Sequence, residues 1–318
     1  MEKLILVEGL PGSGKSTTAQ WLYHSFCQSE IPSQWFYELS GNHPLSYSSD
    51  IDKISKKLIL KESVDLWEAF AQSTIDDSKV TIIDSGFFQK NILRMMSMNI
   101  NRNDIHNYAL QVEVMIGKYD AHFIYLNSGD AETHMLKAYK KRGRRFQDAL
   151  VQWSNSMEYS VCNGYMKVSG SLAFWRDYKE LCDSIYRKFR LNKIEIDVAK
   201  EVWPEHYTTL SRLLGIKGYD NVNNSSAFHG KLSGDYVMRD SDFAVNIKER
   251  LGSFSITNLL HPLESESLMM PNGSNDFFIR GHDVSLRFGE FRRGLPEVME
   301  VSSSWNKVNG RVFDRIGQ

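Results

Sequence analysis

The sequence predicts a three-layer α/β/α domain with a parallel sheet, followed by a small antiparallel β domain, and three observations support this fold class. Short apolar runs alternate with longer stretches of helical character over residues 1–215. A stretch rich in Asn, Ser and Gly follows at residues 219–230. Beyond it, short β-like runs are divided by turn residues. Alternating strands and helices favour right-handed βαβ units and a parallel sheet with helices on both faces.

Five apolar runs are the expected strands of the parallel sheet. The first run, residues 3–8 (KLILVE), has no helical period and suits a strand that is buried on both faces. The remaining runs are residues 34–39 (QWFYEL), 80–84 (VTIID), 122–126 (HFIYL) and 193–198 (KIEIDV). The expected helices are residues 17–28, 63–73, 104–117, 130–141, 172–190 and 205–214. At least one helix thus follows every strand, as crossovers between parallel strands require.

The boundary between the two domains is expected near Gly218. The last helix of the first domain ends before Gly215, and glycine is a common residue at a helix C-terminus. The linker-like stretch then begins at residue 219. We therefore predict an α/β domain over residues 1–217 and a β domain over residues 218–318. The runs expected to form strands of the β domain are GDYVM, FAVNI, SFSITNL, DFFIR, VSLRFG, EVMEV and RVFDR.

The composition is that of an ordinary globular protein. Of the 318 residues, 42% are hydrophobic and 24% are charged, which provides enough apolar surface for one large or two smaller cores. The formal net charge of -1 gives no general attraction for nucleic acid or anionic membranes. No segment holds about 18 uninterrupted apolar residues, so no membrane span is expected. Cys27, Cys162 and Cys182 lack a CxxC spacing, which indicates reduced thiols and a cytoplasmic protein.

The first motif with chemical meaning is the glycine-rich stretch at residues 9–17 (GLPGSGKST). It satisfies the pattern G-x-x-x-x-G-K-[ST] and lies between an expected strand and an expected helix. Glycines let successive backbone N–H groups converge on phosphate oxygens at the partly positive start of the helix. The lysine then reaches the β- and γ-phosphates, and the serine ligates Mg²⁺. The expected ligand is a nucleoside triphosphate with Mg²⁺, and its candidate contacts are Gly9, Pro11, Gly12, Ser13, Gly14, Lys15, Ser16 and Thr17.

Two further features are expected beside this loop. Asp84 closes the third strand with a carboxylate, which would hold a Mg²⁺-bound water or activate an acceptor. The fourth helix runs into the cationic segment KKRGRR, residues 140–145, at the place where P-loop kinases carry a mobile lid. Arginines of such a lid stabilise charge on the transferring phosphoryl group. The other interpretation of this segment is a solvated surface patch.

With these motifs the chain resembles the nucleoside and nucleotide kinases among the P-loop proteins, especially thymidylate kinases and deoxynucleoside kinases. The resemblance is carried by GLPGSGKST, by the strand end IIDS and by IYLNSGDAETHMLKAYKKRGRR. It implies a five-stranded parallel sheet, ATP as the phosphoryl donor and a small-molecule acceptor. It also implies that Glu38 takes the proton of the acceptor hydroxyl. The implied catalytic residues are Lys15, Glu38, Asp84, Arg142, Arg144 and Arg145, with Ser16 and Asp84 as Mg²⁺ ligands.

Two positions depart from the pattern of these kinases. The family typically follows the third-strand carboxylate with arginine, whereas Asp84 is followed by Ser85 and Gly86. The usual Glu-Pro pair after the second strand is replaced by ELSGNHP, which contains His43, a candidate base or acceptor contact. Both changes fall where the acceptor would bind. The sequence therefore leaves the identity of the acceptor open.

Three functional hypotheses follow from these motifs. The leading one is an ATP-dependent kinase for a small molecule, with nucleosides and nucleotides among the candidate acceptors. The second is a nucleotide-dependent ATPase or switch that acts on a partner. The third is a polynucleotide 5′-hydroxyl kinase, which needs a basic groove and is disfavoured by the near-neutral charge. Nothing in the sequence indicates an oligomeric state.

The β domain carries a resemblance of its own. The segments GKLSGDYVM, DFFIR and WNKVNGRVFDRI resemble the small lipocalin-like β domain that is appended to some serine β-lactamase-like hydrolases. No catalytic motif accompanies them. Ligand capture, partner binding and a structural cap all remain open as roles for this domain.

Overall fold

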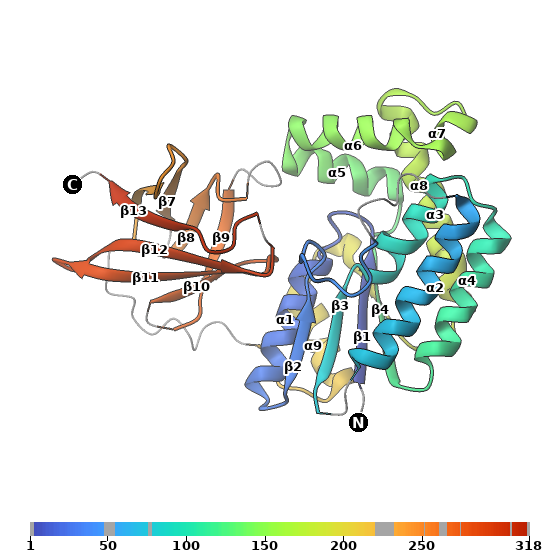
Figure 1. Ribbon diagram of the computed structural model, residues 1–318, viewed down its shortest axis with the longest axis horizontal. Coiled ribbons are helices and arrows are strands. Elements are labelled where there is room, and N and C mark those ends of the chain that lie inside the picture. Colours follow the sequence, from blue (N-terminus) through green and yellow to red (C-terminus); the bar gives the residue numbers. More distant parts are fainter. Residues whose placement is uncertain are drawn as a thin grey trace. The chain divides into compact units, whose positions relative to one another are not determined.

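The chain folds into two compact units, one with α/β architecture and one all-β (Figure 1). The first unit comprises Met1–Glu38 and His43–Gly218, and the second comprises Leu39–Asn42 and Tyr219–Gln318. The computed structural model describes residues 3–47, 55–75, 78–219, 232–250, 252–260, 266–273, 275–305 and 307–316.

The first unit is built on a five-stranded sheet in which every neighbouring pair of strands is parallel. Its strands are β1 (Lys3–Gly9), β2 (Ser33–Phe36), β3 (Val80–Asp84), β4 (Asp120–Asn127) and β5 (Asn192–Asp197). The order across the sheet is β2-β3-β1-β4-β5. β3 is buried along its whole length, and β1 at every position after Lys3, as expected for central strands covered on both faces. The predicted fold class is confirmed.

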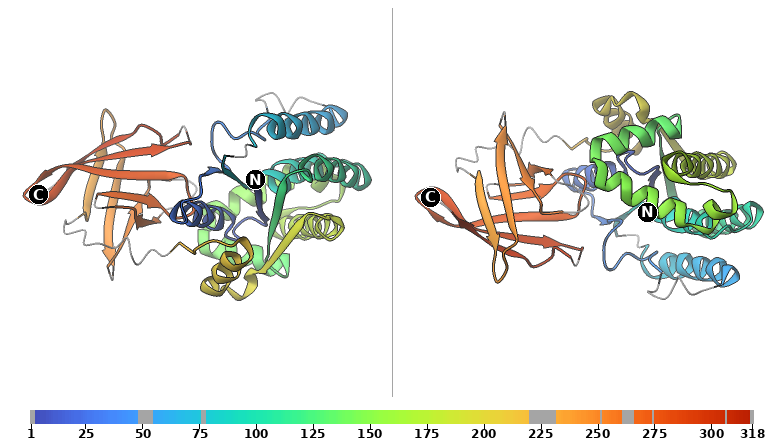
Figure 2. Two further views of the ribbon diagram at one scale, coloured as in Figure 1. Left: turned by 90° about the horizontal axis from the view of Figure 1, so that it is seen from below. Right: turned by 90° about the horizontal axis from the view of Figure 1, so that it is seen from above.

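Helices cover both faces of this sheet. The helical elements are α1 (Lys15–Gln28), α2 (Lys56–Ser73), the π-helix η2 (Gly86–Ile92), α3 (Leu93–Ser97), α4 (Arg102–Ile116), α5 (Ala131–Arg142), α6 (Arg144–Ser156), α7 (Glu158–Cys162), α8 (Lys167–Lys188), the short 3₁₀ helix η3 (Val198–Lys200) and α9 (Trp203–Leu214). The two views of Figure 2 show α2, α4 and α8 on one face and α1 and α9 on the other. The core on the first of these faces is strongly aromatic and includes Trp67, Phe87, Tyr108 and Phe123, all of them buried.

Two features of the α/β unit differ from the sequence-based expectations. The second strand ends at Phe36, although the apolar run QWFYEL extends to Leu39. β2 lies at the edge of the sheet and pairs with β3 alone, so its last residues have no second neighbour to hold them in the sheet. The segment expected to form the lid, residues 140–145, is also helical except at Gly143, because α5 runs to Arg142 and α6 begins at Arg144. The sequence predicted neither α6 nor α7.

The second unit is a closed antiparallel barrel of eight strands. Its strands are β6 (Gly234–Met238), β7 (Ala244–Arg250), β8 (Ser253–Thr257), β9 (Glu266–Pro271), β10 (Asp276–Ile279), β11 (Val284–Arg292), β12 (Leu295–Ser303) and β13 (Val312–Ile316). Each strand pairs with the next along the chain, and β13 pairs with β6 to close the barrel. The predicted antiparallel β domain is therefore confirmed, and the closure removes both edges of its sheet.

Large apolar side chains fill the inside of the barrel. Buried residues alternate with exposed ones along β11, where Val284, Leu286 and Phe288 are buried. The rings of Tyr236 and Phe277 join that of Phe288 in a cluster, with centroids 6.1 Å and 5.7 Å from it, respectively. An eight-stranded barrel has an interior just wide enough for such side chains. In the described helices of the chain, no segment is both long and apolar enough to cross a membrane.

The core of the α/β unit provides a matched stability test on α4. Val112 is fully buried against the sheet-facing core, whereas Val114, two residues later, is 78% exposed. We expect Val112→Ala to lower the free energy of unfolding by about 2 kcal/mol, because it removes two buried methyl groups. Val114→Ala should change it by less than about 0.5 kcal/mol. Urea unfolding followed by tryptophan fluorescence measures both, and equal effects would contradict this packing.

Candidate functional site

The site predicted from the sequence lies at the carboxyl ends of β1 and β3, which are neighbours in the sheet. From β1 the chain continues to β2, which lies beyond β3. From β3 it continues to β4, which lies beyond β1 in the opposite direction. Where connections leave adjacent parallel strands in opposite directions, a crevice opens at the carboxyl ends of the strands, and ligands bind there.

The loop that the sequence predicts to bind phosphate, residues 9–15 and here called the phosphate loop, connects β1 with α1 and has a backbone that only glycine adopts easily. Gly12 and Gly14 have positive φ angles of 81° and 92°. A Cβ atom on Gly9 would lie only 2.7 Å from the Leu126 carbonyl oxygen and from Ser13 Oγ. No side chain caps the start of α1, so the first N–H groups of this helix are available to an anion.

Helix α5 packs directly on the phosphate loop. His134 Nε2 donates a hydrogen bond to the carbonyl oxygen of Pro11 at 2.9 Å. Burial lowers the pKa of His134, which favours the neutral ring in this contact. Ala138, one helical turn later, lies so close to Gly12 that a Cβ atom there would be 3.2 Å from the Ala138 methyl group. Arg142 follows after one more turn, on the same face of the helix as Ala138.

Lys15 is buried beneath the loop, with 5% of its surface exposed. Its Nζ donates a hydrogen bond to the carbonyl oxygen of Leu10 at 3.0 Å. Burial lowers the pKa of Lys15, and the positive charge of Arg142 acts in the same direction. Three carboxylates oppose this decrease, namely those of Glu38, Asp84 and Glu8, in order of their effect. The ammonium group thus lies within the field of all three acids.

Asp84 ends β3 and is completely buried. Ser85, which has a left-handed backbone at φ 63°, donates a hydrogen bond from Oγ to Asp84 Oδ1 at 2.8 Å. Burial raises the pKa of the Asp84 carboxyl to about 6, and the negative charge of Glu38 adds to the rise. Oδ2 has no partner in normal hydrogen-bond geometry, although the Ser16 hydroxyl is near enough to favour the ionised form.

Glu38 reaches this site from the turn that follows β2. Its Oε1 accepts a short hydrogen bond from Gln89 Nε2 of η2. The residue is partly exposed, and its charge acts on Lys15 and Asp84. The structure therefore brings together the residues expected from the phosphate loop, the second strand and the third strand.

The three arginines of the expected lid have different surroundings. Arg142 lies over the ring of Phe146, with its guanidinium carbon 4.8 Å from the ring centre, and its charge acts on Lys15. Arg144 has a side chain that is 92% exposed, and its Nε is 3.6 Å from Asp148 Oδ2. Arg145 is also exposed. Arg142 is exposed like the other two arginines, but its charge contributes to the lowered pKa of Lys15.

Glu8 is a residue of this site that the sequence analysis missed. It is fully buried near the end of β1, and its Oε1 accepts a hydrogen bond from Phe87 N at 2.6 Å. Burial raises the pKa of Glu8 to about 8, although this backbone contact and Lys15 lower it. The available signal was a carboxylate at the end of an apolar strand, the same pattern that singled out Asp84.

His43, a candidate base in the loop after β2, is buried in a neutral form. Burial lowers its pKa to about 3, and the positive charge of Lys90 adds to the effect. Its Nδ1 accepts a hydrogen bond from the backbone N–H of Leu45 at 3.2 Å. The ring also lies near Gly86, where a Cβ atom would be 3.7 Å from His43 Cε1. These contacts hold the loop against the start of η2.

The residues present fit a Mg²⁺–nucleotide complex. Buried Ser13 Oγ has no hydrogen-bond partner, and neither has Asp84 Oδ2. The described residues include no group of three or more His, Cys, Asp or Glu side chains that could hold a metal ion without help. Mg²⁺ is commonly bound by one or two protein oxygens together with phosphates and water. Ser16 and Asp84 provide oxygens of this kind beside the loop.

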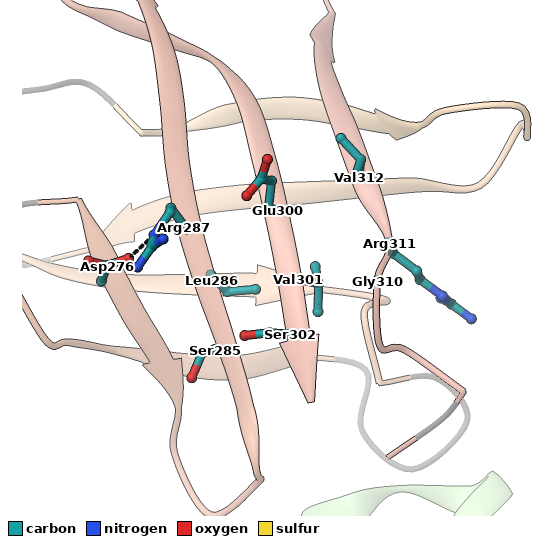
Figure 3. Close-up of a pocket in the computed structure, with 10 residues that line it drawn as sticks. All are labelled: Asp276, Ser285, Leu286, Arg287, Glu300, Val301, Ser302, Gly310, Arg311 and Val312. Atoms are coloured by element: carbon teal, nitrogen blue, oxygen red, sulfur yellow. Dashed lines mark hydrogen bonds and ion pairs between the residues drawn. The ribbon is translucent and has the colours of Figure 1, made fainter. Parts of the chain in front are cut away.

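A groove on the barrel contains none of these residues. It has a volume of about 310 Å³ and lies along β10, β11, β12 and the segment leading into β13 (Figure 3). Exposed residues such as Ser285 and Arg287 line it together with buried Leu286 and Val301, and Arg287 Nε donates to Asp276 Oδ1 at 2.8 Å. The polar groups of that pair already satisfy each other. No sequence-predicted site residue lies in the groove.

No protein-family model matches the chain, and no curated protein is significantly similar to it. The function is therefore inferred from the residues of the site and from their geometry.

The raised pKa of Glu8 predicts a pH-dependent stability. Between the ordinary value of 4.5 and about 8, the folded state binds a proton that the unfolded state has lost. The stabilisation is therefore complete below pH 4.5 and is lost as the pH rises through 8. Glu8→Gln keeps an acceptor for Phe87 N but cannot ionise. We expect the variant to gain stability relative to the parent between pH 5 and pH 8, by up to about 1 kcal/mol per pH unit.

Urea unfolding of the parent and Glu8→Gln at four pH values checks this expectation. Glu68→Gln, at an exposed position on α2, serves as the control and should show no such trend. A stability difference between Glu8→Gln and the parent that is constant with pH would contradict the protonation of Glu8.

Proposed function

We propose that this protein is an ATP-dependent phosphotransferase that moves the γ-phosphoryl group to a small-molecule acceptor. One observation carries the proposal most strongly. Buried Lys15, in the loop after β1, and buried Asp84, at the end of the neighbouring β3, lie at one edge of the sheet. Glu38, after β2, is tied to η2, the helix that follows Asp84, by the hydrogen bond from Gln89. Phosphoryl transfer requires a phosphate cradle, a cation, a carboxylate for the acceptor and little other chemistry from the protein. This site has these parts.

The phosphate loop would bind the donor. Backbone N–H groups of the loop and the uncapped start of α1 would hold the phosphates, and Lys15 would exchange its contact with the Leu10 carbonyl oxygen for a phosphate oxygen. Ser16 and Asp84 would hold Mg²⁺. When bound, Mg²⁺ neutralises phosphate charge as it develops.

The acceptor would bind on the side of Glu38. This carboxylate lies close enough to Asp84 to raise the pKa of that residue, and it would take the proton of an acceptor hydroxyl. Arg142, at the end of α5, would stabilise negative charge on the transferring group, since its charge already acts on Lys15. A nucleoside and a nucleotide are both candidate acceptors under this mechanism.

Lys15→Met tests the assignment of the phosphate loop. The variant keeps the length of the side chain and removes the charge, so we expect phosphoryl transfer to fall by at least about a hundredfold while the fold is kept. The measurement is incubation with ATP, Mg²⁺ and a metabolite extract, with mass spectrometry of products heavier by one phosphoryl group. Lys61→Met, on the exposed face of α2, is the control. Undiminished transfer by Lys15→Met would refute the proposed kinase site.

The arginines of α5 and α6 provide a second test. Arg142→Ala should lower kcat by about a hundredfold to a thousandfold and change ATP affinity less, because its bonds to the transferring group form in the transition state. Arg144→Ala, which removes an exposed side chain that interacts with Asp148, should have a much smaller effect. Steady-state kinetics and ATP titration of both variants make the comparison. An equal loss in the two variants would contradict a special role for Arg142.

A further inference from the structure

Lys90 lies in the acceptor side of the site, although no sequence motif points to it. It belongs to η2, the π-helix that begins two residues after Asp84. π-Helices are rare and often occur at functional sites. Gln89, the residue before it, donates a hydrogen bond to Glu38 Oε1, and Lys90 Nζ donates one to Ser46 Oγ at 3.2 Å. Both contacts join η2 to the segment that follows β2.

The charge of Lys90 is only partly satisfied. An ammonium group has three donors, and the described structure gives this one a single hydrogen bond, to Ser46. Burial lowers the pKa of Lys90, while the carboxylates of Glu38 and Asp84 oppose the decrease. The described ion pairs include none between Lys90 and either carboxylate. The ammonium is therefore close enough to interact with both charges but is bonded to neither.

A hydroxyl group can use the hydrogen-bond acceptor of Glu38 and the hydrogen-bond donors that Lys90 leaves unused. Glu38 can accept a hydrogen bond, and Lys90 can donate one, so a hydroxyl placed between them is satisfied as donor and as acceptor. Gln89 Oε1 is buried without a partner and adds another acceptor. A second hydroxyl of the same compound could donate to it. The nearby hydroxyl of Tyr47 is already bonded, to Ser63 and Asn91.

The charges on this side disfavour an anionic acceptor. A phosphate or carboxylate nucleophile would have to approach the carboxylate of Glu38, and like charges in a partly buried site repel. Lys90 offsets this repulsion only in part, because its charge also acts on Asp84. The next cation along the chain, Arg94, acts on Tyr47. An uncharged hydroxyl compound avoids this cost.

We propose that the phosphoryl acceptor is a hydroxyl group of an uncharged compound, and that Lys90 and Glu38 together hold its reacting oxygen. This inference rests on the proposed kinase function. The hydroxyl oxygen forms a new bond to the γ-phosphorus as the bond to the β,γ-bridging oxygen breaks, and ADP leaves with that electron pair. Glu38 takes the hydroxyl proton. Lys90 stabilises the negative charge that develops on the oxygen as its proton leaves.

The first experiment compares two pools of acceptors with the full-length protein, Mg²⁺ and ATP labelled in the γ-phosphate. One pool contains uncharged nucleosides and polyols, and the other contains the 5′-monophosphates of the same nucleosides. We expect label in the uncharged pool, with at least tenfold less in the monophosphate pool. Preferential labelling of the monophosphates would overturn the inference and leave the proposed kinase function standing.

The second experiment uses variants and does not depend on finding the acceptor. Lys90→Met, Lys90→Arg and the surface control Lys61→Met are compared in ATP hydrolysis without acceptor, where water replaces the hydroxyl compound. We expect Lys90→Met to lower kcat at least tenfold and ATP affinity less than twofold. Lys90→Arg should recover part of the rate, and Lys61→Met should match the parent. Thermal unfolding of each variant separates loss of function from loss of folding.

The outcomes distinguish failure of the proposed role of Lys90 from failure of the proposed kinase function. If Lys90→Met hydrolyses ATP as fast as the parent, Lys90 does not contact the reacting oxygen and the inference fails. If Lys90→Met loses rate and ATP affinity together and Lys90→Arg recovers neither, Lys90 has only a structural role and the inference also fails. If the parent binds no ATP, as judged by calorimetric titration, the proposed function itself fails.

Discussion

The compensation of buried charges at the carboxyl ends of β1 and β3 is the constraint on which the α/β unit depends. Glu8, Asp84 and Lys15 are almost completely enclosed, and burial shifts the pKa of each toward its neutral form. An unpaired buried charge is strongly destabilising, so Lys15 and Asp84 can stay charged only because each lies in the field of the other, whereas burial keeps Glu8 protonated. The register between β1 and β3, which sets Val7 beside Asp84, keeps them together.

This constraint also explains the unusual backbone around the site. The carboxylate of Glu8 holds the backbone N–H of Phe87, so the start of η2 is tied to the end of β1. Gly86 has no room for a side chain, because a Cβ atom would lie 2.4 Å from Ile83 Cγ2. The turn between Asp84 and η2 is therefore fixed from both sides. A rigid turn here presents Gln89 and Lys90 to the segment after β2.

The barrel is stabilised in another way. Its interior is apolar and aromatic, and its closed sheet leaves no strand edge unpaired. Charged side chains lie on the outside and form pairs across neighbouring strands, such as Arg287 with Asp276 and Arg239 with Asp314. Exposed pairs of this kind contribute little to stability, so the packed interior and the hydrogen bonds between strands are the main source of its order.

The sequence by itself determined the α/β class, the antiparallel β unit, the glycine-rich loop between β1 and α1, and the strand end at Asp84. These features depend on contiguous residues, because hydrophobic period, glycine spacing and strand-to-helix order are set locally. Only the tertiary structure decided that Glu8 binds the backbone of Phe87 across 79 positions, and that Lys90 bonds to Ser46 within the field of Glu38 and Asp84. It also decided the early end of β2 and the closure of β13 onto β6. Such contacts depend on packing between distant segments and on the cost of burying charge, and neither leaves a pattern in adjacent residues.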